Sequence, residues 1–139
     1  MAYTHFDAVS VKNGGFAVGK KGSEVAVIDA NRNVIAKRIS SAVSVITPGA
    51  TPTLNCALGD VFTLTPAEAE NISASNLTAG QKINIIITTS GTTTYTLTFG
   101  TNFKSTGTLA TGTSTGKIFV VAFVSDGTNL SEVSRTTAM

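Results

Sequence analysis

The sequence predicts an all-β protein, in which an extended N-terminal arm with short strands precedes a small β-sandwich or jelly-roll domain. Three observations support this class. The length of 139 residues suits one domain with an appended arm. Charged residues make up only 13% of the chain, so neutral hydroxyl groups and backbone must cover much of its surface. Apolar residues alternate with threonine at a period of two, which is typical of half-buried strands.

The arm is predicted to span residues 1–46. It holds six of the ten basic residues and three of the eight acidic residues, so its net charge is +3. Strand-like runs at 6–11, 24–28 and 34–46 are separated by turn-forming Asn and Gly. Because these runs are too short and too polar to close a core of their own, we expect them to pair with the main domain or with another chain.

Residues 47–52 are the predicted linker, since two prolines there lack the N–H donors that a β-ladder needs. Residues 53–139 then form the predicted sandwich or jelly roll, with hairpin turns expected at 90–91 and 125–127. Residues 66–71 favour a short helix, and no internal sequence repeat is visible. The expected strands of the domain are 61–64, 82–89, 92–99, 118–124 and 128–135.

The core of the domain can be predicted from the same strands. Strand 118–124 is apolar on both faces, which predicts a central strand that is covered on both sides. In strand 92–99 the large apolar residues, among them Tyr95, share one face and threonines occupy the other. The expected core residues are Phe62, Ile83, Ile85, Ile87, Leu97, Phe99, Ile118, Val120 and Phe123.

Residue types that catalysis needs are scarce. The chain has one histidine, His5, and one cysteine, Cys56, which supply neither the usual nucleophile–base pair nor a zinc ligand set. Glu68 and Glu70 are the one close pair of carboxylates, and we expect them to decorate the start of a helix rather than to face one catalytic cleft. The sequence therefore predicts a protein that is not an enzyme and uses no metal or cofactor.

Composition also argues against two classes of partner. The net charge of +2 is far below the basic excess that is typical of nucleic-acid-binding proteins. No apolar run approaches the roughly 20 residues of a membrane-spanning helix. The first ten residues do not look like a signal peptide. We therefore expect no nucleic-acid partner, no membrane partner and synthesis in a cytoplasm.

The basic residues of the arm are the candidate contact residues. On one interpretation they form a solvated edge that keeps strands from aggregating. On the other they bind an acidic protein surface. Both interpretations remain open on the residues alone. The residues concerned are Lys12, Lys20, Lys21, Arg32, Lys37 and Arg38.

Two parts of the chain resemble proteins of tailed bacteriophages. The segments Phe99–Leu109, Gly116–Asn129 and Glu132–Arg135 look like a β-domain that is common in phage structural proteins. The opening, Tyr3–Val18 with Gly19–Val27, resembles the start of phage capsid decoration (cement) proteins. The resemblance implies a non-enzymatic virion protein, synthesised in the host bacterial cytoplasm. As a homotrimer it would bind the major capsid protein lattice on the capsid exterior and stabilise the head.

The same β-domain also occurs in phage fibres, which leaves a second function open. A head-fibre or tail-fibre module would bind carbohydrate of the host surface through loops such as 101–116. The chain has no tryptophan, and Tyr95 falls on the apolar face of its strand, so the aromatic platforms of most sugar sites are not evident. For the decoration protein, we expect the N-terminal arm to carry much of the attachment to the capsid.

Overall fold

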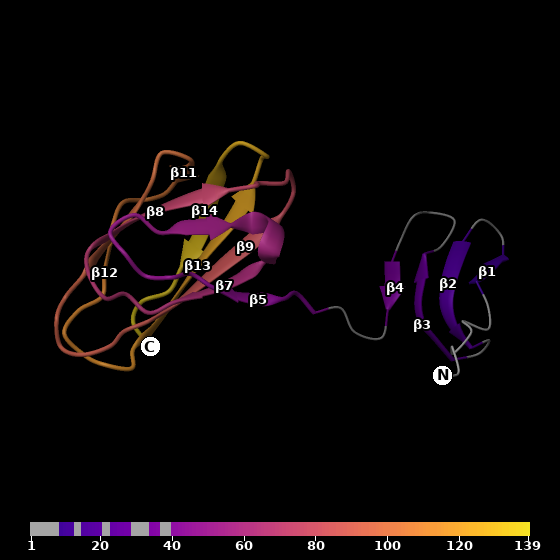
Figure 1. The fold of residues 1–139 in the computed structure, drawn as a ribbon, viewed down its shortest axis with the longest axis horizontal. Coiled ribbons are helices and arrows are strands. Elements are labelled where there is room, and N and C mark those ends of the chain that lie inside the picture. The colour runs from indigo at the N-terminus through magenta and orange to yellow at the C-terminus, as the bar shows by residue number, and fades with distance from the viewer. Residues whose placement is uncertain (1–8, 13–14, 21–22, 29–33, 37–39) are drawn as a thin grey trace, which may run out of the picture. The chain divides into compact units, whose positions relative to one another are not determined.

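The computed structural model describes residues 9–12, 15–20, 23–28, 34–36 and 40–139. In these residues the predicted all-β class is confirmed, and the one helical element is a single 3-10 turn, η1 (Cys56–Leu58). The chain divides into two compact units, Met1–Ser40 and Ser41–Met139. Each unit is described separately below (Figure 1).

The first unit is a four-stranded antiparallel sheet. Its strands pair in chain order, from β1 to β4. Two residues separate β1 from β2 and β2 from β3, a length that suits hairpins. The strands of the arm therefore pair with one another, whereas the sequence predicted partners outside the arm. The strands are β1 (Val9–Lys12), β2 (Gly15–Lys20), β3 (Ser23–Ile28) and β4 (Val34–Ala36).

The second unit begins with three coils of a parallel β-solenoid. In each coil the chain runs through one strand of a first sheet and then one strand of a second sheet. In the first sheet β5, β7 and β9 are parallel neighbours, and in the second sheet β6, β8 and β10 are parallel neighbours. The strands are β5 (Val43–Val45), β6 (Thr53–Asn55), β7 (Val61–Leu64), β8 (Glu70–Ser75), β9 (Lys82–Thr88) and β10 (Thr96–Phe99).

The rest of the chain closes the open end of the third coil. Strand β13 (Ile118–Ser125) pairs antiparallel with β9, and β14 (Leu130–Arg135) pairs antiparallel with β13. The short β11 (Phe103–Lys104) adds to β14, and β12 (Leu109–Ala110) adds to β10. The result is a six-stranded sheet, in the order β11-β14-β13-β9-β7-β5, and a four-stranded sheet, in the order β12-β10-β8-β6.

The predicted sandwich or jelly roll is wrong. Those folds are built mainly from antiparallel strands, whereas the first six strands of this unit wind in parallel. The hairpin expected at 90–91 does not form, because residues 89–95 carry the chain from β9 in one sheet to β10 in the other. The expected helix at 66–71 is also wrong, since residues 67–68 form a bend and β8 follows.

The boundary between the units lies six residues before the predicted end of the arm. Strand β5 belongs to the six-stranded sheet, and Ile46 lies in the core with 3% of its surface exposed. The predicted linker, 47–52, connects β5 to β6 within the second unit. Its Ala50 and Pro52 carbonyl groups accept hydrogen bonds from β8, so this connection is fixed to the neighbouring coil.

One core lies between the two sheets of the second unit. Six of the nine predicted core residues are buried, namely Phe62, Ile83, Ile85, Ile87, Leu97 and Phe123. Phe99 and Val120 are only partly buried, and Ile118 is 39% exposed. The reason is that only one side of β13 faces the core. Phe119, Val121 and Phe123 lie on that side, and the residues that alternate with them point away from the core. The prediction that this strand is covered on both sides is therefore wrong.

Candidate interaction surfaces

The described part of the first unit does not bring the candidate basic residues together. Lys12 ends β1 and lies opposite Gly15, while Lys20 ends β2 and lies opposite Ser23. The two lysines are therefore at opposite ends of β2, which is roughly 17 Å long at the usual rise of a strand. Four further predicted contact residues lie outside the described residues, namely Lys21, Arg32, Lys37 and Arg38.

The candidate chemical groups of the sequence do not form a cluster. Cys56 is buried, and burial together with the charge of Asp60 raises the pKa of its thiol. Glu68 is exposed while Glu70 is 2% exposed, so the two carboxylates do not face one cleft. His5 lies outside the described residues. Among residues that the structure describes, no three His, Cys, Asp or Glu side chains are grouped as metal ligands would be, and no helix has the length and apolarity to span a membrane.

Glu70 is the buried carboxylate of the second unit. It begins β8, opposite Leu97 on β10, and it points to the same side as the fully buried Ile72. Burial raises the pKa of Glu70. The N–H groups of Ala67 and Gly49 offset part of this shift, yet neither carboxylate oxygen has a hydrogen bond of ordinary geometry. The ionised side chain is therefore poorly compensated in the folded state.

Glu70→Gln should stabilise the protein at alkaline pH. Because the folded-state pKa is raised, the ionised carboxylate destabilises the fold above that pKa, and protonation removes the penalty as the pH falls. We expect a gain of about 1 kcal/mol at pH 8 that shrinks towards pH 4, measured by urea titration across pH. Glu68→Gln, at an exposed position, is the matched control. A gain that is constant across pH would contradict the explanation.

Arg135 and Glu132, both on β14, form an ion pair that also binds the loop between β11 and β12, and we call this arrangement the clamp. The guanidinium Nε and one terminal nitrogen donate to the two Glu132 carboxylate oxygens, at 2.7 and 2.8 Å. The guanidinium also donates to the carbonyl groups of Thr108, at 2.9 Å, and Gly107, at 3.3 Å. Its carbon atom lies 5.5 Å from the centre of the Phe99 ring. The clamp thus joins loop 105–108 to β14 and to the core.

The clamp should make stability fall in acid. The hydrogen bond from Arg135 lowers the pKa of Glu132 to about 2, from 4.5. Its contribution is therefore complete above pH 4.5 and is lost as the pH falls towards 2. We expect Arg135→Gln to cost about 1–2 kcal/mol at pH 7, a value reduced for partial exposure, and to cost little at pH 2.

Thermal unfolding of the unmodified chain and of Arg135→Gln between pH 2 and pH 7 measures how the cost of the substitution depends on pH. Lys104→Gln, at an exposed position of β11, is the matched control for the loss of one positive charge. If Arg135→Gln costs the same at pH 2 as at pH 7, the contribution of the residue comes from packing on Phe99 and not from Glu132.

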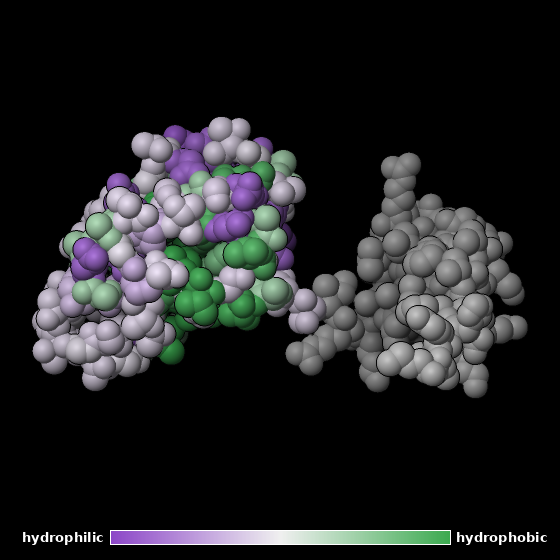
Figure 2. Space-filling view, viewed as in Figure 1, coloured by the Kyte–Doolittle hydropathy of each residue, from purple (hydrophilic) through white to green (hydrophobic). Residues whose placement is uncertain are grey.

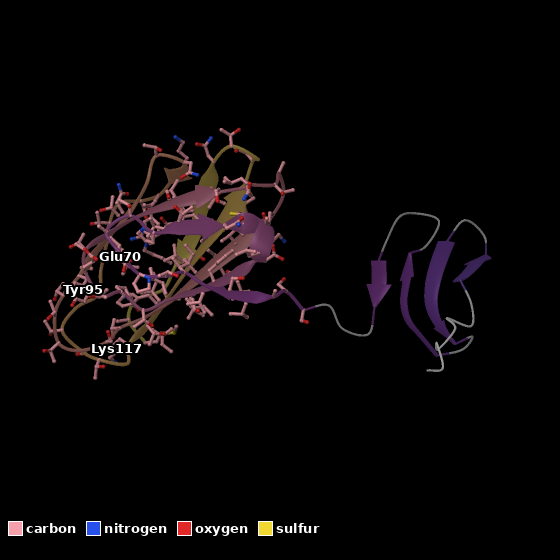
Figure 3. The ribbon with its side chains drawn as sticks, viewed as in Figure 1. Glu70, Tyr95 and Lys117 are labelled. Atoms are coloured by element: carbon pink, nitrogen blue, oxygen red, sulfur yellow. The ribbon has the colours of Figure 1, made fainter. Side chains whose placement is uncertain are left out.

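Two loops lie side by side at one end of the solenoid. Thr89 Oγ1 donates to the Ser114 carbonyl at 2.6 Å, and the N–H of Tyr95 donates to Thr111 Oγ1 at 2.8 Å. Figure 3 shows Tyr95 and Lys117 at this end, together with Glu70. Tyr95 is partly buried and Lys117 is exposed. This loop end, formed by residues 89–95 and 111–117, presents hydroxyl groups and a lysine but no exposed aromatic platform.

The outer face is the side of the six-stranded sheet that points away from the core. Its residues form rows across neighbouring strands, because each pairs in register with the next and alternates with a buried residue. Figure 2 shows apolar residues, in green, gathered over the part of the surface where β5 and β7 run. One row is Val45, Thr63, Ile86 and Val120, and the next is Val43, Val61, Asn84 and Ala122.

Sequence reasoning missed the outer face as a surface. The signal was present in strand 118–124, whose two faces are both apolar. A second buried layer was the simplest explanation of that pattern, but in the second unit no layer covers this side of the sheet. The apolar residues of β13 that lie on it, with Ile118 39% and Val124 38% exposed, are in contact with solvent.

Comparison with known proteins adds no relative. No protein-family model matches the chain, and no curated protein sequence matches it. The features that bear on function are therefore the basic first unit, the loop end and the outer face.

Proposed function

We propose that the chain is a non-enzymatic structural protein of a tailed-phage virion. In this proposal it is a capsid decoration (cement) protein on the exterior of the head. The observation that carries the proposal is the division of the chain into two units of opposite net charge. The first unit holds six of the ten basic residues, and the second has four basic and five acidic residues. A basic unit attached to a weakly acidic, hydroxyl-rich β-solenoid suits adhesion to a repeated acidic surface through the basic unit.

The proposed partner is the major capsid protein lattice, and the proposed form is a homotrimer. A single copy with a small contact area would bind weakly. Three copies that are held together bind three lattice sites at once, which increases avidity without stronger individual contacts. The solenoid suits the role of the exposed body, because its coils are joined by backbone hydrogen bonds between parallel strands.

Removing the positive charge of the first unit should weaken capsid binding. We expect neutralisation of Lys20, Lys21, Lys37 and Arg38 together to slow association with expanded capsids and to flatten its dependence on salt. The control is neutralisation of Lys82, Lys104 and Lys117 in the second unit. Binding is measured by co-sedimentation with empty capsids over a salt series.

Deleting the first unit provides the complementary measurement. A chain that begins at Ser41 keeps β5 and Ile46, and we expect it to fold but to bind capsids weakly. Equal affinity of the full chain and the shortened chain at every salt concentration would move the attachment surface to the second unit. A reconstruction of the intact particle in which this chain lies on the tail would contradict the capsid assignment.

A fibre module that binds host-surface carbohydrate is the second candidate. The loop end favours it, because residues 89–95 and 111–117 are held side by side by hydrogen bonds and carry many hydroxyl groups. A glycan array and a bacterial adsorption assay with the full chain test this function. Competable glycan binding that is lost on changing Tyr95 or Lys117 would favour the fibre module over the decoration protein.

A further inference from the structure

The outer face carries Val45, the most exposed large apolar side chain of the second unit, and several others. Val43 and Val45, on β5, are 62% and 78% exposed. At the other end of the sheet Met139, which is 59% exposed, pairs with Ile118 through two backbone hydrogen bonds, so both side chains lie on the same side. Exposed apolar side chains therefore occur on the outer face from its β5 edge to the C-terminal residue, with threonine and asparagine among them.

The exposed apolar side chains of the outer face extend across several strands. Val124 and the half-buried Ile86 and Val120 continue the set from β5 over β9 to β13. A stable interface buries about 800 Å² on each partner. The polar side chains of Thr63 and Asn84 lie within the same rows, between the apolar residues, and an interface on this face would cover them as well.

The charge on the outer face is low and lies at one end. Among the outward positions of the six described strands, Lys82 and Lys104 are charged, and both lie in the row that runs through Val124. The two rows that start at Val43 and Val45 hold no charged residue. A charged partner would find no complementary group there, whereas an identical apolar face matches it.

The edge of the sheet at β5 is short and carries no charge. Natural edge strands are blunted by shortness, a charged residue, a proline or a bulge, and of these β5 has only its length of three residues. Strand β5 has the sequence Val-Ser-Val and continues in register with β7, and among the residues that the structure describes it has no second neighbour in its sheet. An uncharged edge beside an apolar face favours a surface that another chain covers.

We infer that the outer face is the surface at which copies of this chain associate, with the outer face of one copy packed toward that of a second copy around a common axis. Val45, Ile86 and Val120 form one row of the contact, which runs from the β5 edge to β13. This inference deepens the proposed function, since it names the surface that holds the proposed trimer together. It does not depend on capsid binding, and the measurements of mass and cross-linking that test it need no capsids.

The test compares two lysine substitutions in the full chain. Val45→Lys places a charge in the uncharged row of the contact, and Thr98→Lys places the same charge on an exposed β-branched position of the four-stranded sheet. We expect light scattering and sedimentation to give the mass of two or three copies for the unmodified chain and for Thr98→Lys. Val45→Lys should raise the dissociation constant at least tenfold and leave the circular dichroism spectrum unchanged.

A cross-linking experiment keeps the test decisive if Val45→Lys unfolds. Cys56 is buried, so a cysteine introduced at Val120 or at Thr98 is the accessible one. A short bismaleimide should join copies of Val120→Cys and leave Thr98→Cys as single chains. A monomeric chain at every concentration overturns the inference, as does an oligomer that Val45→Lys leaves intact. Loss of capsid binding in Val45→Lys with no change of mass would assign the face to the capsid protein instead, and it also overturns the inference.

Discussion

Phe123→Ala should lower the free energy of unfolding by about 3–5 kcal/mol, the largest effect expected of a single substitution in the second unit. Phe123 is 1% exposed and lies in the centre of β13. Its ring centroid lies 5.4 Å from that of Phe99 and 5.1 Å from that of Phe103, at tilted and edge-to-face angles that favour aromatic pairs. Truncation leaves a cavity that both rings border, and the two sheets on either side cannot close it without breaking their ladders.

A denaturant titration measures this change, provided that the dependence on denaturant concentration stays the same in both proteins. Val133→Ala is the control, because Val133 is 64% exposed on the neighbouring β14 and its truncation should change stability by less than about 0.5 kcal/mol. A loss below about 1 kcal/mol for Phe123→Ala would mean that the site is not closed and packed.

Gly59→Ala should cost about 2–4 kcal/mol, because strain and a steric clash act together. Gly59 follows η1 with a φ of 153°, a conformation that residues with a side chain rarely adopt. A Cβ atom there would lie 2.5 Å from the carbonyl oxygen of Ala42. That oxygen belongs to the backbone just before β5, so the clash can be relieved only by moving the first strand of the sheet.

Gly49→Ala is the matched control for this change. Gly49 lies in the connection between β5 and β6, and a Cβ atom there would have no neighbour within 4 Å. It should be neutral, or stabilising by a few tenths of a kcal/mol through the reduced freedom of the unfolded chain. Thermal unfolding of both variants compares them directly, and equal melting temperatures would show that the backbone near Ala42 adjusts at no cost.

Strand positions in the second unit could be predicted from the sequence because apolar periodicity is a local property. The expected strand at 61–64 matches β7, and the expected strands at 82–89 and 118–124 differ from β9 and β13 by one residue. The turn at 125–127 was also predictable. Asp126 Oδ1 accepts hydrogen bonds from the N–H groups of Thr128 and Asn129, which is the chemistry that such turns require.

The direction of strand pairing could not be predicted, because it depends on where a connection ends and not on its composition. A Ser-Gly pair at 90–91 is compatible both with a hairpin and with a longer passage between sheets. The coils also differ in length and share no sequence repeat. Val43 on β5 pairs with Val61, which pairs with Asn84, so the spacing changes from one coil to the next.

Residues that act at long range were missed for a similar reason. Asn102 donates to the Ala74 carbonyl at 2.6 Å and accepts from the Ala74 N–H at 3.3 Å, so its side chain replaces a strand partner at the end of β8. Nothing local distinguishes it from the other polar residues of its loop. The basic residues of the first unit were grouped by charge alone, and their role as contact residues stays a prediction. Their positions along the strands separate at least Lys12 from Lys20.

The order of the strands has a consequence for synthesis, which proceeds from the N-terminus. The three coils pair with their predecessors as they emerge, but β9 meets its second neighbour, β13, only after residues 118–125 have been made. Until then the sequence Lys-Ile-Asn-Ile-Ile-Ile-Thr presents an open edge that is rich in isoleucine. Nascent chains that stop between β9 and β13 are therefore the species most prone to aggregate. The hairpin of β13 and β14 covers the open edge of β9 once it has been made.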